Sequence, residues 1–211
     1  MIPIAREVQL VLLVLGLAIA LAQYLFGFSA VWPVWLMFAV LLLLFRDFKR
    51  TIPAIPLAVV SPVDGHITDV RDAVHDPYLK RMAQSVSLRQ ASLGEFNVHS
   101  PIEGKVQNLW VRSATGHAES ELAVWVQTDE QDDVVMVANL SSALRHASCH
   151  ISAGEKLGQG QRCGFMALAC EVVVYLPQTS SVSVRVNQSV RAGSDKLAEF
   201  VHEAGTPSAH P

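Results

Sequence analysis

The sequence predicts a mainly β protein, in which a barrel-sandwich or hybrid-barrel-like β domain follows an N-terminal transmembrane helical hairpin. Three observations predict this arrangement. The first is an apolar run without any charged residue from Val8 to Phe45. The second is a succession of short β-branched segments, separated by Gly, Pro, Asp and Asn, over the rest of the chain. The third is a pair of repeated turn sequences, which suits a barrel built from two similar halves.

The apolar run is long enough for two membrane spans. A helix of about 20 apolar residues crosses a bilayer, and the run is interrupted at Gly27–Ser29 and again by Pro33. The sequence therefore predicts spans at about residues 8–25 and 29–45, joined in a tight hairpin.

Basic residues around the run predict its orientation. Arg46, Lys49 and Arg50 follow the second span, while only Arg6 precedes the first, so both ends are expected in the cytoplasm. This divides the chain into a hairpin of the inner membrane (1–50), a β domain facing the cytoplasm (51–202) and a disordered tail (203–211). An alternative is a cleaved secretory signal ending near Ala20-Leu-Ala22, which would leave a single-span protein with the β domain outside the cytoplasm.

The segments after Pro56 have the composition and spacing of strands in a barrel or sandwich. The predicted strands are Ala58–Val60, His66–Val70, Ser85–Gln90, Phe96–His99, Lys105–Arg112, Leu122–Thr128, Val134–Asn139, Ser148–Ile151, Cys170–Leu176 and Ser181–Val186. One helical turn is predicted, from Pro77 to Gln84.

Two turn sequences occur twice in this region. Ser61–Ile67 (SPVDGHI) is similar to Ser100–Val106 (SPIEGKV), and Ser152–Leu157 is similar to Arg191–Leu197. Each copy of the first pair is a Pro, acid and Gly turn that leads into a strand. The duplication predicts two similar halves. No lysine follows a methionine as it does in carrier domains of this architecture, so a swinging-arm function is disfavoured.

Charge and cysteine content exclude other classes. The net charge of −3 argues against a nucleic-acid partner. Cys149, Cys163 and Cys170 form no CxxC pair and are odd in number, so neither a disulfide framework nor a metal site is predicted.

Cys170 stands where a turn passes into a buried strand. Turns at Gly160 and Gly164 lead towards it, and Glu171–Leu176 is a β-branched run closed by Pro177. A sheet on both sides can hold a reactive backbone in a strained geometry. The same pattern also fits an ordinary small, buried, apolar cysteine.

Five features follow the apolar hairpin in a fixed order: Phe45–Pro53 (RDxxRxIP), Val60–Gly65 (SPxDG), Phe96–Gly104, the turns at Gly154, Gly158 and Gly164, and Val172–Pro177. This order resembles the short, membrane-anchored type of phosphatidylserine decarboxylase, and the resemblance extends over about residues 40–200. Members of that family are proenzymes that cut themselves before the serine of a Gly-Ser pair into α and β chains. The serine becomes a pyruvoyl group, whose ketone is the electron sink for decarboxylation.

Aligned on Tyr175-Leu-Pro177, the pair of the family falls on Ala169-Cys170. A deprotonated thiol is able to begin the same reaction. The methyl group of Ala169, however, restricts the backbone where glycine leaves it free.

The resemblance also implies two partners for Cys170. His99 corresponds to the histidine that deprotonates the attacking side chain, and Asp64 to the aspartate that orients this histidine. Without the family, Asp64 is an ordinary turn residue and His99 an ordinary histidine at a strand end. Phe96 stands where longer members carry a second histidine.

Gly193-Ser194 is the only Gly-Ser pair and a rival cleavage site. No Tyr-Leu-Pro strand follows it, and cleavage there would release only residues 194–211, too few to hold a cofactor.

The sequence thus predicts a lyase that converts phosphatidylserine into phosphatidylethanolamine, with a pyruvoyl group made from Cys170. Its expected partners are phosphatidylserine, membrane lipid and its own α and β chains, and a homodimer is compatible with the family. The alternative is a non-catalytic family member that retains a lipid-binding or interaction role.

Overall fold

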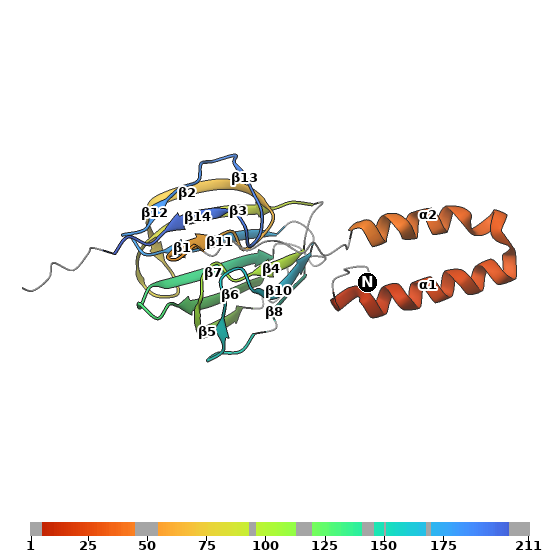
Figure 1. Cartoon of the computed structure of the whole chain (residues 1–211), viewed down its shortest axis with the longest axis horizontal. Coiled ribbons are helices and arrows are strands. Elements are labelled where there is room, and N and C mark those ends of the chain that lie inside the picture. Colours follow the sequence, from red (N-terminus) through yellow and green to blue (C-terminus); the bar gives the residue numbers. More distant parts are fainter. Residues whose placement is uncertain are drawn as a thin grey trace, which may run out of the picture.

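The computed structural model describes residues 6–44, 55–92, 96–112, 120–140, 146–149, 151–167 and 170–202. A pair of helices precedes a β domain, and the helices lie side by side, apart from the strands (Figure 1). The predicted tail 203–211, the basic segment 46–50 and Ala169 lie outside the described residues.

The helices are α1 (Arg6–Phe26) and α2 (Phe28–Leu44). Only a few of their side chains, such as Leu12, Ile19 and Val31, are buried, and most of the other large apolar side chains are exposed. A polar bond joins the two helices, in which Trp35 Nε1 of α2 donates to Gln23 Oε1 of α1 at 2.7 Å. Both predicted spans are therefore helical. Within the described residues, only Gln9–Phe26 is long and apolar enough to cross a membrane, while Val31–Leu42 is a shorter apolar helix.

The β domain contains short and long strands, which account for nearly all of its regular structure. They are β1 (Ala58–Val60), β2 (Gly65–Asp76), β3 (Arg81–Gln90), β4 (Asn97–His99), β5 (Gly104–Arg112), β6 (Ser120–Gln127), β7 (Asp133–Leu140), β8 (His146–Cys149), β9 (Lys156–Leu157), β10 (Arg162–Ala167), β11 (Glu171–Leu176), β12 (Ser181–Val182), β13 (Ser189–Val190) and β14 (Lys196–Glu199).

These strands form three antiparallel sheets. The large sheet has eight strands in the order β13-β2-β3-β11-β7-β6-β5-β9, and the small ones have the orders β1-β14-β12 and β4-β10-β8. The strands wrap around a core rich in Val, Leu and Ile (Figure 1). Alternation along β11 explains this core, because Val172, Val174 and Leu176 are buried while the residues between them are partly exposed. The predicted mainly β fold is confirmed.

The duplicated turns adopt matching structures. The hydroxyl of Ser61 donates to the carbonyl of Val63 at 2.7 Å, and the hydroxyl of Ser100 donates to the carbonyl of Ile102 at 2.8 Å. β13 then pairs with β2 after the first turn as β9 pairs with β5 after the second. The repeated sequences thus form two similar halves, as the duplication predicted.

The predicted helical turn from Pro77 to Gln84 is wrong. Residues 77–80 form the turn of a hairpin, and β3 begins at Arg81. The carboxylate of Asp76 accepts hydrogen bonds from the main-chain nitrogens of Tyr78 and Leu79, at 2.8 and 3.3 Å. This side chain caps the hairpin turn, and pairing of β3 with β2 and β11 then overrides the weak helical tendency.

Four strands escaped prediction: β9, β10, β13 and β14. Three of them have only two or four residues, too few for a periodic pattern. β10 is longer, but Gly164 interrupts it and the sequence suggested a turn there.

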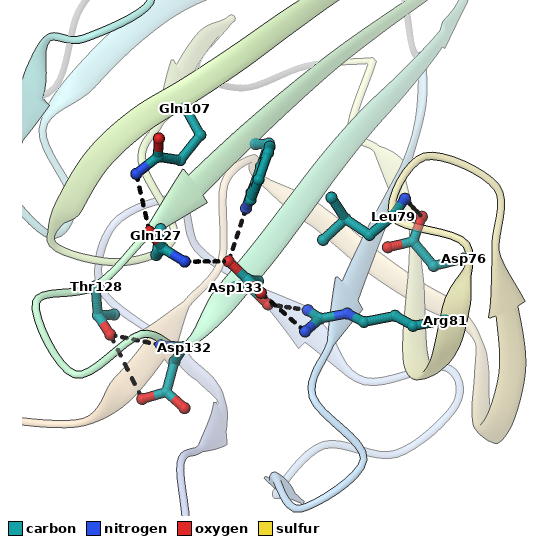
Figure 2. A network of polar contacts seen from close by, with 9 residues as sticks. Asp76, Leu79, Arg81, Gln107, Gln127, Thr128, Asp132 and Asp133 are labelled. Atoms are coloured by element: carbon teal, nitrogen blue, oxygen red, sulfur yellow. Dashed lines mark hydrogen bonds and ion pairs between the residues drawn. The ribbon is translucent and has the colours of Figure 1, made fainter.

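Asp133 is the centre of a polar network at the start of β7 (Figure 2). Its Oδ1 accepts from Trp125 Nε1 and Gln127 Nε2, both at 2.9 Å. Its Oδ2 accepts from Arg81, which also donates to the main-chain carbonyl of Asp133. The side chain is 17% exposed. The carboxylate of Asp133 therefore connects β3, β6 and β7 at one end of these strands.

We expect Asp133→Ala to lower the free energy of unfolding by about 2–4 kcal/mol, because it leaves the partly buried guanidinium of Arg81 without its carboxylate. Urea unfolding of the full chain in detergent measures the change. The control is Asp129→Ala in the preceding turn, since Asp129 pairs with Lys156 and both side chains are more than 70% exposed. A similar loss in both variants would contradict the assigned role of the network.

The partly buried hydroxyl of Tyr78 is expected to make the domain less stable at high pH. Its hydroxyl donates to Glu121 at 3.0 Å and its ring packs on Trp110. Burial, and then the hydrogen bond to Glu121, raise the pKa of Tyr78 to about 12. Because the folded pKa exceeds the value of about 10 in unfolded chains, this stabilisation is complete below pH 10. It is lost as the pH rises through about 12.

Burial also raises the pKa of Tyr175. A titration followed by tyrosinate absorbance should therefore include a step near pH 12 that belongs to Tyr78, and Tyr78→Phe should remove that step. An identical curve for the variant would show that another group causes it.

Candidate functional site

Cys170 lies immediately before β11 and is completely buried. Its main-chain carbonyl accepts a hydrogen bond from the nitrogen of Gln90, at the end of β3, with a length of 2.9 Å. The sequence-based placement of Cys170 at the entry of a buried strand is therefore correct. Ala169, the other half of the predicted cleavage pair, lies outside the described residues.

Asp64 lies in the first Ser-Pro turn, between β1 and β2. Its main-chain carbonyl accepts from the nitrogen of Ala91, and its Oδ1 accepts from the nitrogen of Ala192, both at 2.8 Å. Asp64 and Cys170 thus bond to two successive residues, Ala91 and Gln90. The carboxylate also holds the turn that contains Ala192 and Gly193.

His99 ends β4, and its ring lies against the same turn. Its Nδ1 is 2.7 Å from the carbonyl oxygen of Gly160. Because a carbonyl oxygen can only accept, Nδ1 carries the proton in this bond, which leaves the lone pair of the neutral ring on Nε2. A Cβ built on Gly193 would be only 3.2 Å from His99 Nδ1. The histidine is therefore packed between Gly160 and Gly193.

These contacts connect the three predicted site residues. Asp64 bonds to Ala192, and the neighbouring Gly193 lies so close to His99 that an added Cβ would be 3.2 Å from Nδ1. Cys170 bonds to Gln90, which precedes the residue that Asp64 binds. The structure therefore brings the segments of Asp64, His99 and Cys170 to one region of the β domain.

β10 completes this region, although the sequence did not predict it as a strand. It pairs with β4, with Arg162 opposite His99 and Phe165 opposite Asn97. β10 ends at Ala167, three residues before Cys170 in the sequence. The apolar run of Phe165 and Met166 is a signal that could have identified this strand.

Phe96 fills its place as an apolar residue. Its side chain is 6% exposed and meets the ring of Phe165 edge-on, with the ring centroids 6.2 Å apart. At the position of the second histidine expected from longer members, the site therefore has aromatic packing.

The rival Gly193-Ser194 pair belongs to the turn that supports His99. The nitrogen of Gly193 donates to the carbonyl of Ser61 at 2.7 Å, and Gly193 has a φ of 66°. This pair is followed by a turn at Asp195 and the short strand β14. Its observed contacts are those of a supporting turn.

A cavity of about 390 Å³ lies away from Cys170, beside the second Ser-Pro turn. It is lined by Leu57, Glu103 and the β6–β7 turn Thr128–Glu130, among others. That turn lies at one end of β7, whereas Glu171 pairs with Asn139 near the other end. A much smaller apolar cavity of about 20 Å³ lies under β11, where Val172 and Met166 line it. The buried Cys170 itself does not line either cavity.

Over the described ranges, no group of three or more His, Cys, Asp and Glu residues is arranged to hold a metal ion.

Comparison with known proteins identifies the family. A family model described as phosphatidylserine decarboxylase matches residues 38–198. A phosphatidylserine decarboxylase proenzyme of Nitrosomonas europaea is 37% identical over 192 residues, which cover 85% of this chain and 87% of the relative. A protein of the same name from Burkholderia multivorans is 36% identical over 209 residues, or 93% of this chain and 96% of the relative.

No solved structure gave a significant match. The family match covers most of the chain, and the relatives are similar along almost their whole length. The chain therefore belongs to the phosphatidylserine decarboxylase family.

Proposed function

We propose that this chain is a proenzyme that cuts itself between Ala169 and Cys170 and then decarboxylates phosphatidylserine to phosphatidylethanolamine. The names of the relatives, which are phosphatidylserine decarboxylase proenzymes, support the activity. The observation that carries the assignment to this site is the contact chain from Cys170 through Gln90 and Ala91 to Asp64, and on to the turn beneath His99.

Self-cleavage starts with the thiol of Cys170. His99 Nε2 takes the thiol proton, and Sγ attacks the carbonyl carbon of Ala169. The carbon–sulfur bond forms as the carbon–nitrogen bond breaks, and the imidazolium returns the proton to the departing nitrogen. The Asp64 carboxylate stabilises the imidazolium electrostatically and fixes the turn on which the ring rests.

The second stage removes sulfur from residue 170. Loss of the Cα proton of residue 170 and cleavage of its Cβ–Sγ bond leave dehydroalanine on one chain and a thiocarboxylate on Ala169 of the other. Water then replaces the nitrogen of residue 170, which departs as ammonia, and a pyruvoyl group remains. This group supplies the ketone that accepts electrons when the substrate loses carbon dioxide.

Cys170 suits the role of precursor. It has a leaving group on Cβ, and its buried position, at 0% exposure, keeps the thiol away from water and from outside reagents. Because Cys170 is buried in the uncut chain, the substrate cannot reach it there, and self-cleavage proceeds without bound substrate. Access for the lipid headgroup requires movement of the cut ends.

The proposal includes the membrane arrangement. The hairpin of residues 1–50 anchors the chain in the inner membrane, and the domain of residues 51–202 works on the cytoplasmic face. The outward-facing apolar side chains of α1 and α2 support this, because they would meet lipid rather than water. Membrane lipid would thus supply the substrate, and the cut α and β chains would remain together, with a homodimer as a further expected state.

Mass spectrometry of the denatured protein tests the cleavage. We expect a fragment that starts at residue 170 with a ketone in place of the amine. The matching fragment should end at Ala169 as a thiocarboxylate, which is heavier than a carboxylate by the difference between sulfur and oxygen. Cys170→Ala should remain one chain of 23.0 kDa.

A second variant tests the departure from the Gly-Ser pair. Ala169→Gly combined with Cys170→Ser should mature faster and leave an ordinary carboxylate. Cleavage that persists in Cys170→Ala would move the site elsewhere. A parent chain that stays uncut would favour the non-catalytic alternative, which no present observation supports.

Gly193→Ala tests whether the packing of the His99 ring against Gly193 matters for self-cleavage. The new methyl group would lie 3.2 Å from Nδ1, at a φ of +66°, so the ring must move. We expect self-cleavage to slow by about tenfold, which corresponds to about 1.4 kcal/mol. The control is Gly154→Ala in the related Ala-Gly turn, since φ is +91° there and a Cβ meets nothing within 4 Å.

Both variants carry left-handed strain of about 1–2 kcal/mol. Cleavage is measured by the disappearance of the uncut chain. Equal cleavage rates in the two variants would rule out a role for the packing of His99 against Gly193.

A further inference from the structure

Gln90 is an unusual residue for the inside of this β domain. Its side chain is 2% exposed and lies at the end of β3, on the face that also buries Val86 and Leu88. A buried amide is tolerated only when its donor and acceptor are both satisfied. The partners of this amide therefore indicate why a polar residue stands here.

Both ends of the Gln90 amide bond to the chain around the proposed cleavage site. Nε2 donates to the carbonyl of Met166 at 2.8 Å, and Oε1 accepts from the main-chain nitrogen of Cys170 at 3.4 Å. The main-chain nitrogen of Gln90 also donates to the carbonyl of Cys170 at 2.9 Å. A carbonyl on one side and an N–H on the other fix the orientation of the amide.

These bonds hold the two sides of one short segment. Met166 and Cys170 flank residues 167–169, and the proposed scissile peptide bond joins Ala169 to Cys170. The nitrogen bound by Oε1 belongs to that peptide group. Because a peptide group is planar, a restraint on the N–H of Cys170 limits rotation of the peptide group to which this nitrogen belongs.

We propose that Gln90 is a positioning residue for self-cleavage. It holds the peptide group between Ala169 and Cys170 in an orientation that the thiol of Cys170 can attack. This inference rests on the proposed function. It adds a residue from β3 to the site, which acts through the main chain rather than by contact with the substrate.

The chemistry limits this role to maturation. The nitrogen of residue 170 leaves as ammonia when the pyruvoyl group forms, so the bond from Oε1 to that nitrogen no longer exists in the mature protein. Loss of the Gln90 amide should therefore slow cleavage without an equal effect on decarboxylation. A residue needed only for folding would impair both.

The test compares Gln90→Met with Gln84→Met in the full chain in detergent. Methionine keeps the length of the side chain and removes both hydrogen bonds. Gln84 is a matched control, because it lies on the same strand and the same face and donates to the carbonyl of Gln178, away from Cys170. Cleavage is followed by gel densitometry, and decarboxylation is measured per cleaved chain.

We expect Gln90→Met to cleave at least about tenfold more slowly than the parent, since small errors in orientation have large effects on intramolecular attack. Gln84→Met should cleave at the parent rate, and cleaved Gln90→Met should turn over at the parent kcat. If the parent is cut and Gln90→Met is cut at the same rate, the role of Gln90 is overturned but the proposed function is not. A parent that is never cut would overturn the proposed function as well.

Gln90→Glu decides the matter should Gln90→Met fail to fold. A neutral carboxyl group can donate one hydrogen bond and accept another, as the Gln90 amide does here, whereas the ionised group has lost its donor. Burial favours the neutral form. The cleavage rate of Gln90→Glu relative to the parent should rise as the pH falls, with the melting temperature recorded at each pH. A ratio that does not change with pH would count against positioning by the amide.

Discussion

Two reciprocal hydrogen bonds between the Ser-Pro turns are the constraint on which the site depends. The nitrogen of Val60 donates to the carbonyl of Pro101 at 2.8 Å, and the nitrogen of His99 donates to the carbonyl of Pro62 at 2.9 Å. They join the two similar halves of the domain at their turns. Because Asp64 lies in one turn and His99 directly precedes the other, this junction brings residues far apart in sequence to the same region. The duplication that stabilises the fold also assembles the candidate site.

The two halves have similar backbone geometry at matching glycines. The nitrogens of Gly160 and Gly193 bond to the carbonyls of Ser100 and Ser61, and the two glycines have φ angles of 67° and 66°. His99 lies next to both glycines: its Nδ1 bonds to the carbonyl of Gly160, and its ring packs against Gly193. The half with Asp64 is closed around Cys170, whereas the half with Glu103 borders an open cavity. In the proposed self-cleavage, burial of the Cys170 thiol would strengthen any electrostatic effect of the His99 imidazole and the Asp64 carboxylate on the attack.

Under the proposed function, a cysteine in place of serine at position 170 would change the cleavage products but not the order of the chemical steps. Sulfur attacks readily once deprotonated and also departs readily in the elimination. Alanine before it restricts the backbone more than glycine would. An additional restraint on the peptide group, such as the buried amide of Gln90, is then of most use, because the correct orientation must be held where the chain itself is less free to find it.

The sequence by itself determined the two apolar N-terminal helices, most strands, the burial of Cys170 and the family. These follow from local patterns: an uncharged apolar run, β-branched segments and motifs in a fixed order. Asp64 and His99 were found through the resemblance, since neither stands out locally. The turn at 77–80 was mispredicted because the cap by Asp76 and the pairing of β3 outweigh local propensity. Only the tertiary structure decided which nitrogen of His99 carries the proton and why Gln90 is buried. The partners that settle these points, Gly160 for His99 and Cys170 for Gln90, lie 61 and 80 residues away, and no local period in a sequence specifies such contacts.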